Sequence, residues 1–160
     1  KGDLVRIKNG YYTIRISDFS EEELIAKLFP DCVLNLEAAL YAYGYLERKP
    51  YGYKLSVDKN TSKSRFKLDF PQVTPLYAEP ETLELGVTEI NYGGSRMKIF
   101  EKERLICECL KYEDKMEREL FKEGLLGYIR DPKKDVAKLM RYARERKVVK
   151  KVQTMIGVWL

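Results

Sequence analysis

The 160-residue sequence contains no histidine, the side chain most often used as a general base and as a metal ligand. A Ser-His-Asp triad, a Cys-His pair and a histidine-based zinc site are therefore excluded within this chain. The three cysteines, Cys32, Cys107 and Cys109, are odd in number and form no Cys-x-x-Cys pair, so they predict neither a disulfide framework nor a zinc site. We expect no catalytic residues, no metal and no cofactor.

Long apolar runs are also missing. No stretch approaches the ~18 consecutive apolar residues of a membrane-spanning helix. The sequence begins Lys1-Gly2-Asp3, without the basic and apolar regions of a signal peptide. Together with the odd cysteine count, these features predict a cytoplasmic protein that has no membrane partner.

Positive charge is in excess, and it is concentrated near the end of the chain. The net charge is +5, from 30 basic and 25 acidic residues. Residues 133–151 hold nine basic and two acidic residues, a local net charge of +7, so the remainder of the chain has a net charge of −2. Such segregation predicts a defined surface that faces an anionic partner. The nine are Lys133, Lys134, Lys138, Arg141, Arg144, Arg146, Lys147, Lys150 and Lys151.

The first predicted element is a β-hairpin. Residues 4–8 and 11–16 are β-prone and flank Asn9-Gly10, the preferred sequence of a two-residue type I′ turn. Such a turn pairs Lys8 with Tyr11 and Arg6 with Thr13, which gives one apolar face and one basic face. The basic face either contacts phosphates, as the wing of a winged helix does, or is simply solvated. Its basic residues are Arg6, Lys8 and Arg15.

The next segments predict two helices and a sheet. The helices lie near residues 21–29 and 35–43; Ser20 and Glu23 form a capping box at the first, and Gly44 ends the second. Short β-prone segments then predict a central, mostly antiparallel sheet. They lie at residues 53–57, 65–68, 73–77, 88–92 and 97–100.

After residue 100 the pattern is helical. Helices are predicted at residues 103–112, 116–130, 132–147 and 148–160, with Asp131-Pro132 as the expected start of the third. The chain therefore predicts an α+β fold with an N-terminal β-hairpin, two helices, a central sheet and a C-terminal helical bundle.

The C-terminal basic residues allow two interpretations. Charges of a single sign can follow a nucleic-acid backbone, because each phosphate contact releases a counterion. The alternative is a solvated helix face. The candidate DNA-binding residues of this region are Lys134, Lys138, Arg141, Lys147, Lys150 and Lys151.

Two other functions stay open at this point. The last helix carries four apolar residues that predict a docking or dimer surface for a protein partner: Val152, Ile156, Val158 and Trp159. Glu113-Asp114-Lys115 has the Glu-x-Lys form of metal-dependent nucleases, although those enzymes place it on a strand. Three further carboxylates cluster in the sequence at Glu101, Glu103 and Glu108.

Four segments resemble the AbiEi-type antitoxins of type IV toxin–antitoxin systems. Residues 4–12 resemble the wing of that family's winged helix, and residues 31–44 resemble its helix rich in leucine, alanine and tyrosine. Residues 97–110 are similar to the strand and helix around its Glu-Arg-Thr-Leu-x-Asp pattern, with Leu105 in place of the Thr and Glu108 near the Asp. Residues 138–143 with 148–160 are similar to its final helix pair.

The resemblance implies that residues 1–17 are the trailing wing of an N-terminal winged-helix DNA-binding domain, and that residues 18–160 form the family's C-terminal α+β domain. It also implies a bacterial antitoxin that acts as a transcriptional autorepressor on inverted repeats in the double-stranded DNA of its promoter. Such a protein counters a nucleotidyltransferase-like toxin without a stable complex. A homodimer on the DNA is compatible with the resemblance.

Overall fold

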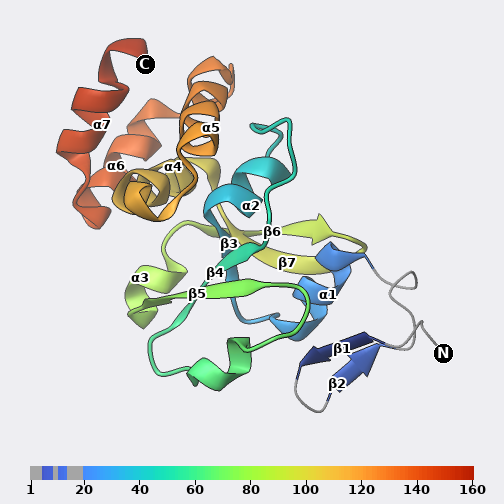
Figure 1. Ribbon diagram of the computed structural model, residues 1–160. Coiled ribbons are helices and arrows are strands. Elements are labelled where there is room, and N and C mark those ends of the chain that lie inside the picture. The colour runs from blue at the N-terminus through green and yellow to red at the C-terminus, as the bar shows by residue number, and fades with distance from the viewer. Residues whose placement is uncertain (1–4, 9–10, 14–19) are drawn as a thin grey trace. The chain divides into compact units, whose positions relative to one another are not determined.

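The computed structural model describes residues 5–8, 11–13 and 20–160, with the backbone alone at 5–8 and 11–13 (Figure 1). The chain divides into two compact units: unit 1 comprises residues 1–34 and 51–99, and unit 2 comprises residues 35–50 and 100–160. Helices and a mixed five-stranded sheet confirm the α+β class. The domain boundary expected near residue 17 lies outside the described residues. None of the helices in the described ranges is both long enough and apolar enough to cross a bilayer.

The N-terminal hairpin consists of β1 (Val5–Lys8) and β2 (Tyr11–Thr13), which pair antiparallel. Lys8 lies opposite Tyr11, as predicted, but the pairing shifts between Arg6 and Lys8, so that Arg6 lies opposite Tyr12 rather than Thr13. The uninterrupted register is therefore wrong, because a bulge breaks the two-residue alternation on which the predicted faces depend. The turn residues Asn9 and Gly10, as well as Arg15, lie outside the described residues.

The sheet of unit 1 has the strand order β5–β4–β3–β7–β6. β4 pairs parallel with β5, and β3 pairs parallel with β7, so the sheet is mixed rather than mostly antiparallel. The connection from β4 to β5 spans residues 59–72, long enough for the crossover that parallel strands require. The strands are β3 (Val33–Asn35), β4 (Tyr53–Asp58), β5 (Val73–Ala78), β6 (Val87–Tyr92) and β7 (Ser95–Phe100).

Helix α1 (Glu21–Leu28) begins at the predicted capping box. The Ser20 Oγ accepts a hydrogen bond from the Glu23 backbone N at 3.0 Å. The turn between β6 and β7 lies against this end of the helix, since a Cβ built on Gly93 would be 2.5 Å from the Glu23 N. Gly93 also has a φ of +63°, so both the close approach and the backbone angle favour glycine there.

A segment of the β4–β5 connection differs from its predicted structure. Residues 65–68 were expected as a strand, but the chain forms a 3-10 helix at Lys63–Phe66, and the Ser62 Oγ caps it by accepting from the Ser64 N at 3.3 Å. Phe66 is buried and stacks on Phe29, with ring centroids 5.4 Å apart. This stacking buries the apolar side chain without a sheet partner. A short helix, α3 (Pro80–Glu84), follows β5.

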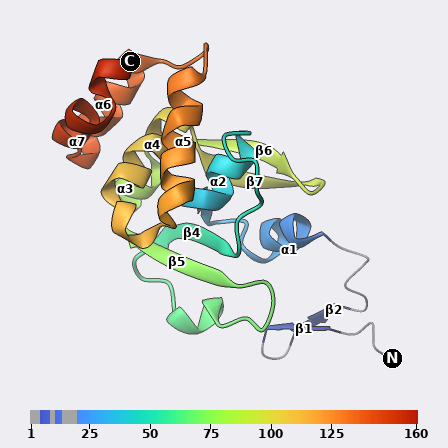
Figure 2. The same cartoon turned by 45° about the horizontal axis from the view of Figure 1, so that its top comes forward.

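Unit 2 is helical, and its central helix is α4 (Lys102–Lys111), which is buried from residue 103 to residue 110. α4 contacts each of the other helices of the unit, some of which Figure 2 shows around it. These are α2 (Leu36–Ala42), α5 (Arg118–Arg130), α6 (Val136–Arg146) and α7 (Val149–Met155). The C-terminal helical bundle is therefore confirmed. Short 3-10 turns occupy Glu113–Lys115 and Gly157–Trp159.

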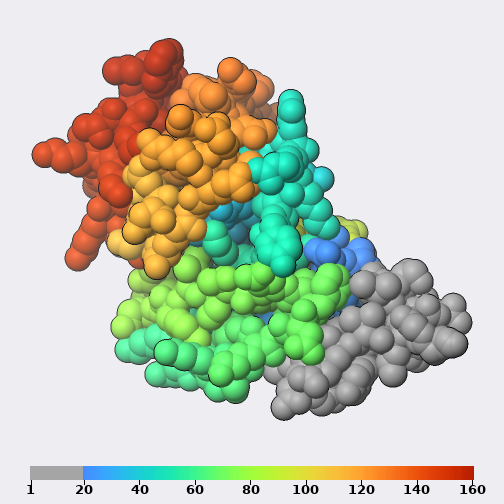
Figure 3. Space-filling model, viewed as in Figure 1, coloured from blue at the N-terminus to red at the C-terminus, as the bar shows by residue number. Residues whose placement is uncertain are grey.

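Two glycines of α5 allow the chain around α2 to approach closely. A Cβ on Gly124 would lie 2.5 Å from a methyl carbon of Leu40, and a Cβ on Gly127 would lie 2.7 Å from the Cβ of Tyr45. Figure 3 shows the segment that follows α2, in cyan, beside the orange atoms of α5. The end of α2 and the residues that follow it therefore pack directly against α5.

Candidate nucleic-acid interface

Helix α6 carries the centre of the basic region, and it begins later than the sequence predicts. Asp131-Pro132 is not its N-cap. The helix begins after Asp135, whose carboxylate accepts a hydrogen bond from the Lys138 N at 3.0 Å. An aspartate can cap a helix when its carboxylate accepts from the backbone N–H three residues later, and both Asp131 and Asp135 could do so from the sequence alone. Tertiary contacts therefore decide which of the two caps α6.

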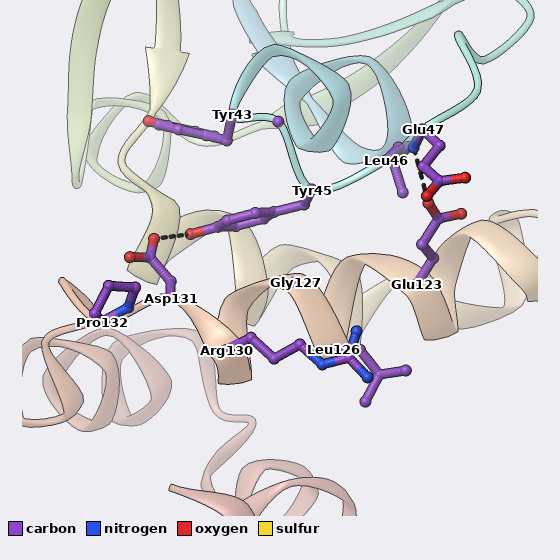
Figure 4. Close-up of a pocket in the computed structure, with 11 residues that line it drawn as sticks. Tyr43, Tyr45, Leu46, Glu47, Glu123, Leu126, Gly127, Arg130, Asp131 and Pro132 are labelled. Atoms are coloured by element: carbon purple, nitrogen blue, oxygen red, sulfur yellow. Dashed lines mark hydrogen bonds between the residues drawn. The ribbon is translucent and has the colours of Figure 1, made fainter.

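Asp131 has a different role, and Figure 4 shows one part of it, the hydrogen bond from the Tyr45 hydroxyl. Its carboxylate accepts hydrogen bonds from the Tyr45 hydroxyl at 2.6 Å and from the Lys102 Nζ at 2.8 Å. These bonds, with that of Lys102 the larger cause, lower the pKa of Asp131 to about 2. Asp131 therefore links the end of α5 to α4 and to the segment after α2.

The carboxylates of Glu101 and Glu103 hold the first part of α6 against α4. Glu101 accepts a hydrogen bond from the Tyr142 hydroxyl at 2.5 Å and lies 3.6 Å from the Lys138 Nζ. Glu103 is buried and accepts from the Asp135 N at 2.8 Å, at the very start of α6. The two bonds fix both the beginning of the helix and the rotation of its Lys138 side toward α4.

The carboxylate of Glu108 holds the last turn of α6 in the same way. It accepts from the Arg146 Nε at 2.5 Å and from the Arg104 Nε at 2.9 Å, and Arg104 also stacks over the Phe100 ring at 4.1 Å. Burial lowers the pKa of Arg104. Burial alone would also lower the pKa of Arg146, but the hydrogen bond and charge of Glu108 outweigh it and raise that pKa. Both guanidinium groups stay charged, because an arginine pKa lies far above neutrality.

The cluster of carboxylates in the sequence is thus an anchor for α6. Glu101, Glu103 and Glu108 each bind a different part of that helix, and Glu101 and Glu103 also line one small cavity together with Asp131. Among the described residues, no group of three or more aspartate, glutamate or cysteine side chains is arranged to hold a metal ion. The arrangement fixes α6 in place against α4.

This anchoring divides the basic region into paired and unpaired cations. Lys138 pairs with Glu101, Arg146 with Glu108, and Lys151 lies 3.8 Å from Glu113 while donating to the Leu110 carbonyl at 2.9 Å. The other six form no ion pair with any side chain that the structure describes. We refer to these six as the cationic set: Lys133, Lys134, Arg141, Arg144, Lys147 and Lys150.

The cationic set lies on the surface of unit 2. Arg141 and Arg144 are one turn apart on the exposed side of α6, opposite the buried Leu139 and Ala143. Lys147 is the left-handed C-cap of α6, with a φ of +62°. Figure 3 shows the atoms of α6 and α7, in orange-red and red, at the surface of the unit. The six charges therefore follow one helix from the turn before it to the start of the next.

The comparison with the predicted site is mixed. Lys134, Arg141, Lys147 and Lys150 belong to the cationic set, whereas Lys138 and Lys151 face carboxylates. The set also includes Lys133 and Arg144, which the predicted site omits; the charge count of the region contains both, and Arg144 lies three residues after Arg141. Arg6 and Lys8 belong to unit 1, and only their backbone is described.

The other two candidate sites change more. Val152 and Ile156 are buried, so these two predicted docking residues pack in the core of unit 2, while Val158 and Trp159 are 87% and 67% exposed. The last helix ends at Met155 because a 3-10 turn follows it. Glu113 lies in a 3-10 turn between helices, 3.6 Å from the Arg118 Nη1, rather than on a strand beside a second carboxylate.

Comparison of the chain with models of protein families and with curated proteins gives no match.

Proposed function

We propose that the chain binds double-stranded DNA through the cationic set, as a transcriptional autorepressor of the antitoxin type. The observation that supports this is the separation of charge on α6. Glu101, at the N-cap of α4, and Glu108, within α4, neutralise the cations on the inner side of α6, whereas Arg141 and Arg144 on its outer side have no acidic partner among the described residues. A cationic surface on a fixed helix is the electrostatic footprint of a protein that contacts a phosphate backbone.

The fixed position of α6 supports DNA, rather than dissolved counterions, as the partner of the cationic set. Phosphate contacts fix the register and orientation of a protein on the duplex, and a helix that is held in place presents its cations in a constant order. Glu103 and Glu108 of α4, with Glu101 at the N-cap of that helix, hold α6 from its start to its last turn, and Arg141 and Arg144 lie between these points. The cationic set supplies up to six phosphate contacts, and the hairpin residues Arg6, Lys8 and Arg15 would add a wing.

The antitoxin part of the proposal depends on the resemblance to the AbiEi type. In that role the protein represses its own operon from inverted repeats in the promoter. It opposes a nucleotidyltransferase-like toxin without a lasting complex, so the toxin is a functional rather than a physical partner.

The proposal is tested by the salt dependence of binding to the duplex promoter DNA. Replacing Arg141, Arg144 and Lys150 together by Gln removes three members of the cationic set. Each phosphate contact contributes about 0.9 to the slope of log Kobs against log salt, so the triple variant should reduce the magnitude of the slope by about 2.7.

The matched control removes the same charge from elsewhere. Lys63, Lys67 and Lys122 are exposed and form no ion pair with the described residues, and their replacement by Gln should leave the slope unchanged. Equal losses in the two triple variants would mean that net charge alone governs binding and would contradict the proposed interface. An unchanged slope in the first variant would remove the cationic set from the interface altogether.

A second candidate function is protein docking through Val158 and Trp159, because two large apolar side chains are this exposed. Trp159 is the single tryptophan of the chain, so its fluorescence reports directly on this surface. Co-purification with the product of the neighbouring gene, with a blue shift of Trp159 emission in the complex, would favour docking over DNA binding alone.

A further inference from the structure

A groove in unit 2 lies beside the end of α5, and its charged lining residues are mostly acidic, in contrast to the cationic set. It is an open cavity of about 710 Å³, a size that is common for ligand sites. Figure 4 shows its two walls: the segment of residues 43–47 that follows α2, and the exposed side of α5 up to Pro132. Both walls belong to unit 2.

Glycines shape the two walls. Gly44 has a φ of +82°, and a Cβ built on it would meet no atom within 4 Å, so the wall is open at this point. On the other wall, Gly127 allows the Tyr45 ring to lie close against α5, and the bond from Tyr45 to Asp131 fixes the ring there. The groove thus has a fixed aromatic side chain beside an open space.

The charged residues that line the groove are mostly acidic. Its carboxylates are Glu47, Glu123 and Asp131, against the single guanidinium of Arg130. Asp131 is engaged by Lys102, but the Glu47 carboxylate makes no hydrogen bond or ion pair with the described residues. Glu123 uses only its Oε2, which accepts from the Glu47 N at 2.8 Å. Two neighbouring carboxylates are therefore available, and they disfavour a phosphate backbone in this groove.

An apolar residue lies next to these carboxylates. Leu126, one turn along α5 from Glu123, is 45% exposed, although large aliphatic side chains are usually buried. An occupant that covers Leu126 and pairs with Glu47 and Glu123 must offer an apolar group and a cation within one short segment. Lysine and arginine beside an aliphatic residue in a peptide have this chemistry.

We propose that this groove binds a basic segment of a protein partner, with an arginine or lysine head between Glu47 and Glu123 and a neighbouring apolar side chain on Leu126. The planar guanidinium of arginine can donate to both carboxylates at once. The stem of the basic side chain would lie along the ring of Tyr45. No residue of the cationic set lines the groove, so this proposal is tested independently of DNA binding.

The experiment uses the full chain and two short peptides. Acetyl-Leu-Arg-Leu-amide is titrated while amide chemical shifts are followed by NMR, with acetyl-Leu-Glu-Leu-amide as the charge-reversed probe. We expect shifts confined to residues 43–47 and 123–132 with the arginine peptide only. Glu47→Gln with Glu123→Gln should weaken binding at least tenfold, and Leu126→Ala about fivefold. The Gln at position 123 still offers an oxygen to the Glu47 N, so the wall should keep its structure.

The matched control is Glu119→Gln with Glu145→Gln, which removes two exposed carboxylates of unit 2 from outside the groove and should leave binding unchanged. Three results would overturn the proposal: no shifts in the groove, equal shifts with the glutamate peptide, or equal weakening by the control pair. Two further results would assign the groove to another occupant and also refute it. These are the same shifts caused by duplex DNA alone, or by raising the protein concentration without peptide.

Discussion

The buried ion group of Arg104, Glu108 and Arg146 gives the sharpest test of how unit 2 holds α6. The change we consider is Glu108→Gln, which keeps the length and shape of the side chain and removes its charge. The side chains of Arg104 and Glu108 are only 1% and 2% exposed. The variant therefore leaves two guanidinium groups, one of them fully buried, in front of a neutral amide.

The magnitude follows from the burial. Removing one partner of a buried ion pair costs about 3–5 kcal/mol, because the remaining charge keeps its desolvation penalty and loses its attraction. For a chain of this length, 1 kcal/mol corresponds to roughly 2–4 °C in the melting temperature, so we expect Glu108→Gln to lower it by about 6–20 °C. A loss of this size is a large part of the ~5–15 kcal/mol by which most domains are stable.

Urea unfolding followed by circular dichroism measures this loss, and Glu113→Gln is the control. Glu113 also faces two cations, Arg118 at 3.6 Å and Lys151 at 3.8 Å, but its side chain is more exposed, and such pairs contribute at most about 1 kcal/mol. If Glu108→Gln is no more destabilising than Glu113→Gln, the buried group does not hold α6, and the account of the anchored helix is wrong.

Three further predictions concern the same unit. Gly127→Ala should lower the free energy of unfolding by about 1 kcal/mol, because the new Cβ would overpack against Tyr45 by more than the gain in helix propensity; an increase in stability would contradict this. Because the pKa of Asp131 is lowered in the folded state, its bonds stabilise the fold above pH ~4, and this stabilisation is lost as the pH falls toward 2. The unfolding free energy of Asp131→Asn, measured in an acid titration, should therefore decline less steeply over this pH interval than that of the unchanged protein. Burial raises the pKa of Cys107 to about 12, so its thiol should react with iodoacetamide only after unfolding, and labelling at Cys107 in the native protein would show that α4 opens.

Local signals in the sequence predict the parts of the fold that depend on neighbours along the chain. The capping box at Ser20, the glycine at the end of α2 and four of the five β-prone segments predicted after residue 50 lie where expected. The short strand β3 and helix α3 have three and five residues, too few for a periodic pattern. The parallel pairing of β4 with β5 joins residues about twenty apart, and no local signal specifies it.

The charge of the candidate interface could be counted from the sequence, but its division into paired and unpaired cations could not. Lys138, Tyr142 and Arg146 follow one another at four-residue spacing and therefore share one side of α6. Helical spacing places Arg141 and Arg144 on another side. Only the carboxylates of Glu101 and Glu108, which lie far from α6 along the chain, determine which of these sides is neutralised.

Two single variants distinguish the effect on DNA binding that the structure predicts from the effect that the charge count alone predicts. Lys138→Gln and Arg141→Gln each remove one positive charge from α6, three residues apart, so composition assigns them the same effect on DNA binding. The structure does not, because Lys138 faces Glu101 at 3.6 Å while Arg141 belongs to the cationic set. We expect Arg141→Gln to reduce the magnitude of the salt slope by about 0.9 and Lys138→Gln to leave it unchanged. Equal reductions would show that the DNA follows the total charge of the segment, and the anchoring by α4 would then have no bearing on binding.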